Sequence, residues 1–198
     1  MKTIIGIAGS LRTGSFNAAL LREAASSAVS GVEVVIKSIA AIPLYNGDEE
    51  EQSGIPTPVQ ELKDAIAAAQ GLLLATPEYN NAMPGVLKNA IDWLTRPPSD
   101  IPRVFGGKPV AMMGASPGGF GTILAQNAWL PVLRTLGTRP WFGGRLLVSH
   151  AHQVFGDGRG DHRRPAQRAD PAVRAGLRCL TVMPRSGVSQ FTFETGAG

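Results

Sequence analysis

The chain has 198 residues, 43% of them hydrophobic and 17% charged, which suits one α/β domain with a substantial core. No run of about eighteen apolar residues occurs, which excludes a membrane-spanning helix, and the N-terminus lacks the pattern of a secretion signal. The single cysteine, Cys179, excludes an internal disulfide framework, and His150 and His152 have no evident third metal ligand. We therefore expect a cytoplasmic protein with no bound metal and no membrane association.

The net charge of +4 comes entirely from the C-terminal end. Residues 1–158 contain 12 Lys and Arg and 12 Asp and Glu, whereas residues 159–198 contain 7 Arg and 3 acidic residues. A basic tail binds polyanions weakly, but it does not turn a neutral domain into a nucleic-acid-binding protein. We expect a folded domain at residues 1–155, an atypical basic tail at residues 156–198, and no nucleic-acid partner.

The first predicted elements are a strand, a short loop and a helix. The apolar run 4–8 indicates a buried parallel strand, and residues 18–25 have apolar residues at helical spacing. This connection directs backbone N–H groups and the positive end of a helix dipole toward an anion. Residues 9–17, the first loop, add three hydroxyl groups, the amide of Asn17 and the guanidinium of Arg12. We interpret the first loop as a phosphate-binding loop.

The composition of the first loop narrows the kind of phosphate. A nucleoside triphosphate loop needs Gly-Lys-Ser/Thr, and no lysine lies between Lys2 and Lys37. A dinucleotide loop needs G-x-G-x-x-G, but here hydroxyl groups replace the glycines. Hydroxyl donors around a helix start favour a single phosphate monoester, such as that of FMN. The alternative is that Ser15 only caps the helix and Arg12 is a solvated loop residue.

Strands and helices alternate through the rest of the domain. Thr57 and Pro58 have the pattern of an N-cap and a first helical residue, and Lys88 and Asp92 have the spacing of a surface ion pair. In chain order we predict strand 32–36, loop 42–48, a solvated acidic loop 49–51, helix 57–69, strand 71–76, helix 86–94, strand 108–114, helix 122–136 and a final strand near 145–149. This alternation predicts a parallel sheet covered on both faces.

Three loops are expected to share the carboxyl edge of that sheet, where such folds bind ligands. They are the first loop, residues 77–84 (the second loop) and residues 115–121 (the third loop). Tyr79 can pack on or beside a flat ring while Pro77 shapes its loop. Gly118 and Gly119 leave their backbone amides accessible to the ring edge. Together the loops predict a site for a flat, phosphorylated ring system.

These motifs resemble those of the NADPH-dependent FMN reductases, a family that includes bacterial chromate, quinone and azo-dye reductases. The resemblance extends from residue 3 to about 155 and is carried by residues 9–17, 77–80, 87–93 and Ser116-x-Gly118-Gly119. It implies a flavodoxin-like, doubly wound, five-stranded parallel sheet with the order 2-1-3-4-5. It also implies noncovalently held FMN, NADPH or NADH as electron donor, and a homodimer or homotetramer.

The resemblance also implies which residues hold the cofactor. Ser10, Arg12, Ser15, Phe16 and Asn17 would hold the phosphate, and Pro77 to Asn80 with Ser116 would line the ribityl chain and the ring. The complete predicted cofactor-binding set is Ser10, Leu11, Arg12, Thr13, Gly14, Ser15, Phe16, Asn17, Pro77, Glu78, Tyr79, Asn80, Ser116, Gly118 and Gly119.

The predicted reaction is hydride transfer from NAD(P)H to FMN and on to a small-molecule quinone, azo, nitro or metal-oxyanion acceptor such as chromate. It needs no side-chain nucleophile, so we assign no catalytic residue. Glu78 is interpreted as structural, or as a partner for an arginine across an interface, with proton transfer as the alternative. The competing functions are a flavodoxin-type electron carrier, which the neutral domain disfavours, and a non-catalytic protein that binds FMN or another phospholigand.

The resemblance ends near Phe155, where the family normally continues into a final amphipathic helix. Residues 156–165 are rich in Arg and Gly instead, and residues 170–177 can start a short helix that Gly176 weakens. This composition is typical of a disordered tail, or of a coding end read in a shifted frame. Without the last helix, one face of the sheet is expected to be partly uncovered, with oligomer contacts as its cover.

Overall fold

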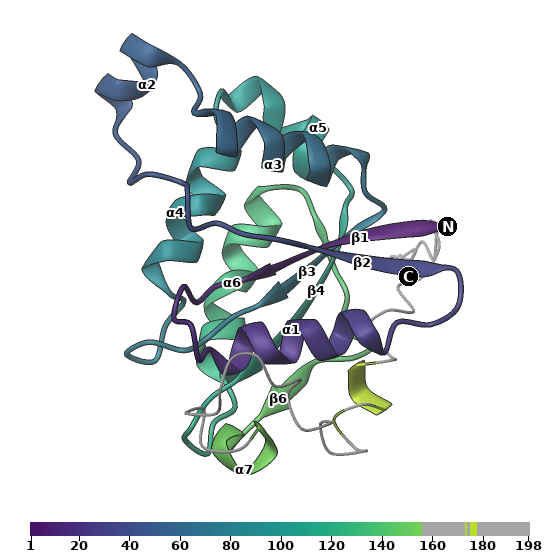
Figure 1. Cartoon of the computed structure of the whole chain (residues 1–198). Helices are drawn as coiled ribbons and strands as arrows, with labels where there is room; N and C mark the ends of the chain where they lie inside the picture. The colour runs from purple at the N-terminus through teal and green to yellow at the C-terminus, as the bar shows by residue number, and fades with distance from the viewer. Residues whose placement is uncertain (156–172, 174, 178–198) are drawn as a thin grey trace, which may run out of the picture.

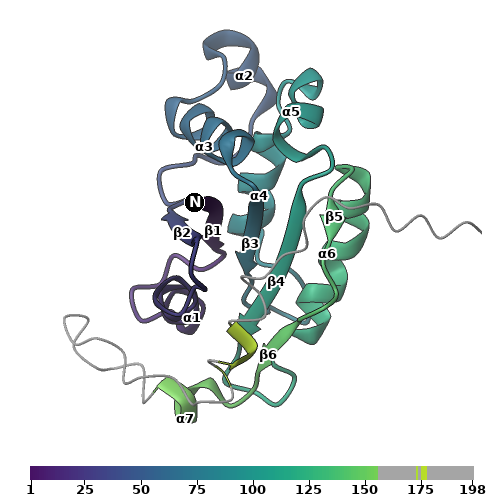
Figure 2. The same ribbon diagram turned by 90° about the vertical axis from the view of Figure 1, so that its right-hand side faces the viewer.

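The computed structural model describes residues 1–155, 173 and 175–177. Its strands are β1 (Lys2–Ala8), β2 (Val32–Lys37), β3 (Gly71–Ala75), β4 (Pro109–Ala115), β5 (Arg139–Pro140) and β6 (Leu146–Val148). They form a parallel sheet of order β2-β1-β3-β4-β5, and β6 also pairs with β4. The predicted flavodoxin-like order 2-1-3-4-5 is therefore confirmed (Figure 2).

The edge position beside β4 is filled by two short strands instead of one. β5 pairs with Pro109 and Val110 at the start of β4, and β6 pairs with Met113–Ala115 at its end. The Gly143-Gly144 pair interrupts the apolar pattern between β5 and β6. The prediction of a single strand near 145–149 is thus right for β6 and misses β5.

Helices cover both faces of the sheet, as Figures 1 and 2 show. One face carries α3 (Thr57–Ala68), α4 (Gly85–Leu94), α5 (Ile101–Phe105) and α6 (Ile123–Thr135), whereas α1 (Phe16–Ser26) and α7 (Ala151–Phe155) lie on the other. Successive residues of one strand enter opposite cores: Leu72 and Leu74 pack with α3 to α6, and Leu73 packs with α1. This burial on both faces explains the continuous apolar runs in the sequence.

Little of the predicted tail belongs to the described residues. Val173 and residues 175–177 are helical, and the side chain of Leu177 is fully buried in the core on the α1 face. The predictions of disorder and of a shifted reading frame concern residues outside the described part. Within the described residues, no helix is long and apolar enough to cross a membrane.

Two predictions are wrong: one concerns the acidic cluster at residues 49–51 and the other the start of α3. The acidic cluster expected in a solvated loop belongs to a helix, α2 (Gly47–Ser53), which has no buried residue and projects from the body of the molecule (Figure 1). Asn46 caps α2 by accepting the N–H of Asp48 at 3.0 Å, and acidic residues in a first turn interact favourably with the helix dipole. The N-cap of α3 is Pro56 rather than Thr57, and no side chain caps that end.

An ion-pair network joins α3 to the 3₁₀ helix η1 (Pro98–Asp100) and to α5. The fully buried Lys63 lies 2.6 Å from Asp100 and also donates to the carbonyl of Arg96. Arg103 donates to both Asp100 oxygens, at 3.1 and 3.0 Å, and to Asp64 at 2.8 Å. Hydrogen bonds from Arg103 and then from Lys63 hold the pKa of Asp100 well below its usual range. The network therefore favours the ionised carboxylate.

Two further lysines have different environments. Lys108 is buried, and its Nζ donates to the carbonyls of Ile66 and Ala69, each at 2.7 Å, at the C-terminal end of α3. A cation there satisfies carbonyls that have no helical partner, although burial lowers the pKa of Lys108. Lys88 pairs with Asp92 at 2.7 Å, with both side chains partly exposed, which confirms the predicted surface pair.

Candidate active site

The three predicted loops follow neighbouring strands. In the sheet order, β1 lies beside β3 and β3 beside β4, so the first, second and third loops leave one carboxyl edge together (Figure 1). The chain continues from β1 to β2, which lies on one side of β1, and then crosses to β3, which lies on the other side of β1. The site is therefore at the topological switch point, where doubly wound folds bind ligands.

The first loop wraps around the start of α1. Ser15 is the N-cap: its backbone is extended, and its Oγ accepts the N–H of Ala18 at 3.2 Å. The N–H of Ser15 donates to the carbonyl of Arg12 at 3.0 Å, which tightens the loop. Ser15 is buried, Ser10 is half-buried and Thr13 is exposed. The loop thus presents hydroxyl groups at the positive end of a helix dipole.

Arg12 is held against its own loop. Its Nη2 donates to the carbonyl of Gly14 at 2.6 Å, and the guanidinium lies 5.6 Å from the centre of the Phe16 ring. Phe16 in turn stacks on Phe155 of α7, with 6.2 Å between ring centres. Arg12 and the neighbouring Leu11 are exposed. The positive charge is therefore positioned by contacts within the described chain while facing solvent.

Gly9 joins the first loop to the second. A Cβ at this position would lie 2.8 Å from Leu87 Cδ2, 3.0 Å from Pro77 Cδ and 3.1 Å from Pro84 Cγ. The N–H of Gly9 donates to the carbonyl of Ala75 at 2.9 Å. A side chain has no room there, so glycine allows the first two loops to approach closely.

Asn17 joins the first loop to the end of β4. Its Nδ2 donates to the carbonyl of Ala115 at 2.9 Å, and its Oδ1 accepts the N–H of Ala115 at 3.0 Å. Only 3% of Asn17 is exposed, so both bonds are shielded from water. The contact of Asn17 with a phosphate stays a prediction. The second hydrogen of its Nδ2 group is the donor that such a contact would use.

The second loop contains a tight turn. Asn80 and Asn81 have φ values of 52° and 59°, and Tyr79 and Ala82 exchange two backbone hydrogen bonds of 3.1 Å. Asparagine tolerates this left-handed conformation better than most residues do. The Tyr79 hydroxyl donates to Ser10 Oγ at 3.3 Å while 48% of Tyr79 stays exposed. The turn therefore presents an aromatic ring beside the first loop.

The Glu78 side chain reaches α6. Its Oε2 accepts the N–H of Leu124 at 2.9 Å and that of Ala125 at 3.0 Å. These groups belong to the first turn of α6, where no helical partner exists. The interpretation of Glu78 as structural agrees with these bonds. Its partner is a helix start in the same chain, which the sequence did not reveal.

The third loop is open around its glycines. A Cβ at Gly118 or Gly119 would meet no atom within 4 Å. Ser116 Oγ donates to the carbonyl of Gly118 at 3.3 Å, and the N–H of His150 donates to the same carbonyl at 3.1 Å. The loop is thus fixed by its own hydrogen bonds and leaves space in front of its backbone.

Sequence reasoning missed a buried cluster beneath the second and third loops. Thr76 Oγ1 donates to the carbonyl of Pro77 at 3.0 Å and accepts Trp129 Nε1–H at 3.1 Å. At Gly114, a Cβ would lie 1.9 Å from Thr122 Oγ1, so α6 begins directly against β4. The one signal in the sequence is the polar residue Thr76 directly after an apolar strand. Nothing in the sequence indicates that Trp129 and Thr122 are its neighbours.

His150 and His152 do not share a strand face. His150 follows β6 with φ 47°, His152 lies in α7, and their ring centres are 6.2 Å apart. Among the described residues, no three His, Cys, Asp or Glu side chains gather closely enough to hold a metal.

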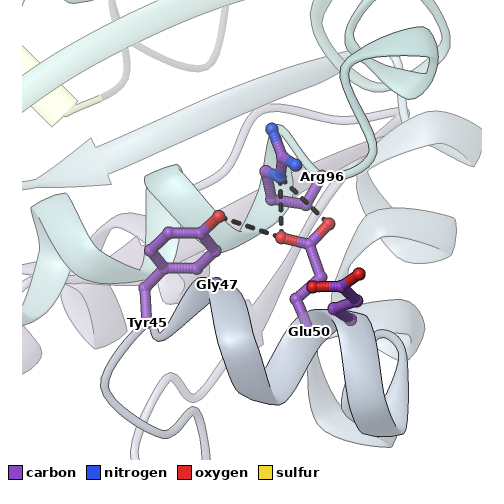
Figure 3. Close-up of a pocket in the computed structure, with 5 residues that line it drawn as sticks. Tyr45, Gly47, Glu50 and Arg96 are labelled. Atoms are coloured by element: carbon purple, nitrogen blue, oxygen red, sulfur yellow. Dashed lines mark hydrogen bonds and ion pairs between the residues drawn. The ribbon is translucent and has the colours of Figure 1, made fainter.

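A separate pocket lies between α2 and α4, lined by Tyr45, Gly47, Glu50, Glu51 and Arg96. Figure 3 shows Tyr45 and Arg96 directed at Glu50: Arg96 Nε donates to both oxygens, at 3.0 and 2.8 Å, and the Tyr45 hydroxyl donates at 2.9 Å. The Arg96 bond lowers the pKa of Glu50, and the bond to Glu50 raises the pKa of Tyr45. We interpret this cluster as the attachment of α2 to the body.

The fold and topology define a flavodoxin-like α/β protein in which three loops meet at one carboxyl edge of the sheet. The sequence matches the family described as NADPH-dependent FMN reductase over residues 2–153, so the chain belongs to that family. An NAD(P)H-dependent FMN reductase of Pseudomonas aeruginosa is 45% identical over 152 residues, which are 77% of this chain and 80% of the relative. A quinone reductase of Escherichia coli is 44% identical over 159 residues, covering 78% and 83%.

A solved structure is similar over most of its length. The flavoenzyme NAD(P)H:(acceptor) oxidoreductase FerB of Paracoccus denitrificans superimposes with a TM-score of 0.75 at 30% identity, covering 91% of this chain and 96% of that one. Together these similarities confirm the predicted oxidoreductase class and the predicted pairing of FMN with NAD(P)H. A small-molecule electron acceptor agrees with the same relatives.

Proposed function

We propose that the chain is an FMN-dependent NAD(P)H oxidoreductase that reduces quinones, with azo, nitro and metal-oxyanion compounds such as chromate as further acceptors. The observation that carries the proposal is the meeting of the three loops at one carboxyl edge. When bound, FMN supplies the chemistry, because its ring can accept a hydride from NAD(P)H and pass electrons to a second substrate. The protein's task is to bind and orient it.

The first loop fits a single phosphate group. Ser10, Thr13 and Ser15 can donate hydroxyl hydrogens, and Ser15 Oγ–H remains a donor although its oxygen accepts the N–H of Ala18. The N-terminus of α1 adds backbone N–H groups and the positive end of the helix dipole. Arg12, already positioned on Phe16, adds a charge at the rim. These donors would hold the phosphate without a lysine.

The other two loops fit a flat ring. Tyr79 presents a partly exposed aromatic side chain beside Ser10, and the open space at Gly118 and Gly119 allows a ligand to approach the backbone. Glu78 is committed to α6, so a proton-transfer role is disfavoured. The predicted set therefore divides into phosphate donors, ring-contacting residues and residues that fix the loops.

The test is an anaerobic visible spectrum of the FMN-reconstituted protein before and after NADPH is added. Flavin bands that bleach, and that recover when a benzoquinone is added, would support the proposal. Bands that persist would favour an electron carrier, and an absence of bound flavin would refute the FMN site. Repeating the recovery step with an azo dye, a nitroarene and chromate tests the remaining acceptors one by one.

We also propose that the protein is cytoplasmic and works as a homodimer or homotetramer. Apolar side chains near the site are exposed in the single chain: Leu11, Tyr79, Val86, Phe120 and Leu124 are between 37% and 65% exposed. Contact between copies would bury such groups near the cofactor. Sedimentation velocity measures the assembly, and a monomer at micromolar concentration would contradict this part of the proposal.

A further inference from the structure

The start of α6 has an unusual backbone. Gly121 and Thr122 have φ values of 56° and 71°, and Thr122, at the N-cap position, makes no side-chain bond to the first turn. Its Oγ1 instead accepts Gln126 Nε2–H at 3.2 Å. The helix therefore lacks a cap from its own sequence, although its first N–H groups need acceptors.

Glu78 supplies this cap from 46 positions earlier in the chain. Its Oε2 accepts the N–H groups of the second and third residues of α6, Leu124 and Ala125, which are the groups that an N-cap side chain normally satisfies. A carboxylate there also interacts favourably with the helix dipole. Trp129, on the same helix, donates to Thr76, the residue directly before the second loop. Two contacts thus connect α6 to the second loop and to the residue that leads into it.

The residue after Glu78 extends this connection into the candidate site. Tyr79 forms the tight turn with Ala82, and its hydroxyl reaches Ser10 of the first loop at 3.3 Å. The bonds that Glu78 makes to α6 therefore also fix the position of the Tyr79 ring and of the backbone around it. Without that bond, the loop would lose an anchor on the α6 side.

We propose that Glu78 is a positioning residue: by capping α6 it holds the second loop in the conformation that receives the isoalloxazine ring. This inference rests on the proposed FMN site. Both partners of the contact belong to the chain itself, so the bond does not depend on a group supplied by the cofactor. Removing this bond would leave the loop to be ordered on binding, which weakens affinity.

The experiment compares Glu78→Ala, Glu78→Gln and a control, Glu61→Ala, which removes an exposed glutamate from α3. FMN affinity is measured by flavin fluorescence, and amide exchange of Leu124 and Ala125 is measured by NMR in the protein without FMN. We expect Glu78→Ala to raise the FMN Kd about tenfold and to accelerate exchange at both amides. Glu78→Gln, whose amide oxygen still accepts N–H bonds, should remain within about threefold of the unchanged protein on the same scale.

Three outcomes would overturn the inference. Unchanged exchange in Glu78→Ala would mean that the carboxylate does not cap α6, and a lower melting temperature with an unchanged Kd would mean that it serves stability alone. Equal loss of activity in both variants with a shifted pH profile would indicate a proton-transfer role. If the unchanged protein binds no FMN, the proposed function fails while the exchange measurement still decides on the cap. If Glu78→Ala does not fold, Glu78→Gln and Glu78→Asp carry the comparison.

Discussion

The Asn17 bridge gives the sharpest stability prediction. Replacing Asn17 by Ala removes both partners of the Ala115 backbone, whose N–H and carbonyl lie at 3.0 and 2.9 Å from the amide. Asn17 and Ala115 are each 3% exposed, so little water can replace those bonds. A buried polar group left without a partner costs about 1–3 kcal/mol, and two such groups give about 2–6 kcal/mol. This is a large part of a typical domain stability of roughly 5–15 kcal/mol.

Urea unfolding of the protein without FMN measures this loss. The matched control is Asn127→Ala: Asn127 is also helical, but it is exposed and accepts one bond from Arg145 at 3.1 Å. We expect the control to change the free energy of unfolding by less than about 0.5 kcal/mol. A loss below about 1 kcal/mol for Asn17→Ala would refute the buried-bridge reasoning.

Asn17→Asp keeps the shape of the side chain and adds a titratable group. Its ionised form would face the Ala115 carbonyl without water, and burial favours the neutral acid in the folded state. The folded-state pKa then lies above the unfolded value of about 3.9, so stability falls as pH rises above about 4. The stability difference from the unchanged protein should therefore widen between acidic and neutral pH. A constant difference would contradict the assignment.

Three further predictions concern stability. Gly9→Ala forces a methyl group between the first two loops, so it should lower the free energy of unfolding by about 1–3 kcal/mol and weaken FMN binding. Its control, Gly85→Ala, places the methyl group in open space and should not destabilise the protein. Urea denaturation measures the stability of both variants, and flavin titration measures their FMN binding. The folded-state pKa of Asp100 is lowered, so its carboxylate contributes stability above pH about 4 that is lost on acidification. The difference in free energy of unfolding between the unchanged protein and Asp100→Asn should therefore shrink between pH about 5 and 2.5. A difference that does not depend on pH would contradict this. Lys108→Ala leaves carbonyls at the end of α3 without their donor and should cost about 2–3 kcal/mol, against less than about 0.5 for the surface variant Lys88→Ala in the same urea assay.

The fold was predictable because its signals are local. Buried strands such as 71–75 are uniformly apolar, and Ser15 is a residue type that caps helices, so the strand, loop and helix at the N-terminus could be located. The positions of the three loops then follow from the parallel topology. The predicted phosphate donors lie at the expected edge, although their contacts with FMN stay predictions.

The errors arise where packing decides instead of local sequence. The acidic residues of α2 resemble a solvated loop, and they form a helix because Asn46 caps it and Arg96, 46 residues after Glu50, attaches it. The bond between Asn17 and Ala115 spans 98 positions. No pattern in one sequence indicates such pairs, because each requires the folded sheet to bring its partners together.

The unexpected contacts have a common consequence for binding. Gly9 brings the first loop against the second, Asn17 connects it to β4, and Glu78 connects the second loop to α6. All of these contacts join groups of the chain itself, so the edge can assemble before the cofactor arrives. A preassembled site loses less conformational entropy on binding, and more of the contact energy appears as affinity. Substitutions at these three positions should therefore weaken FMN binding although none of them removes a predicted phosphate hydroxyl.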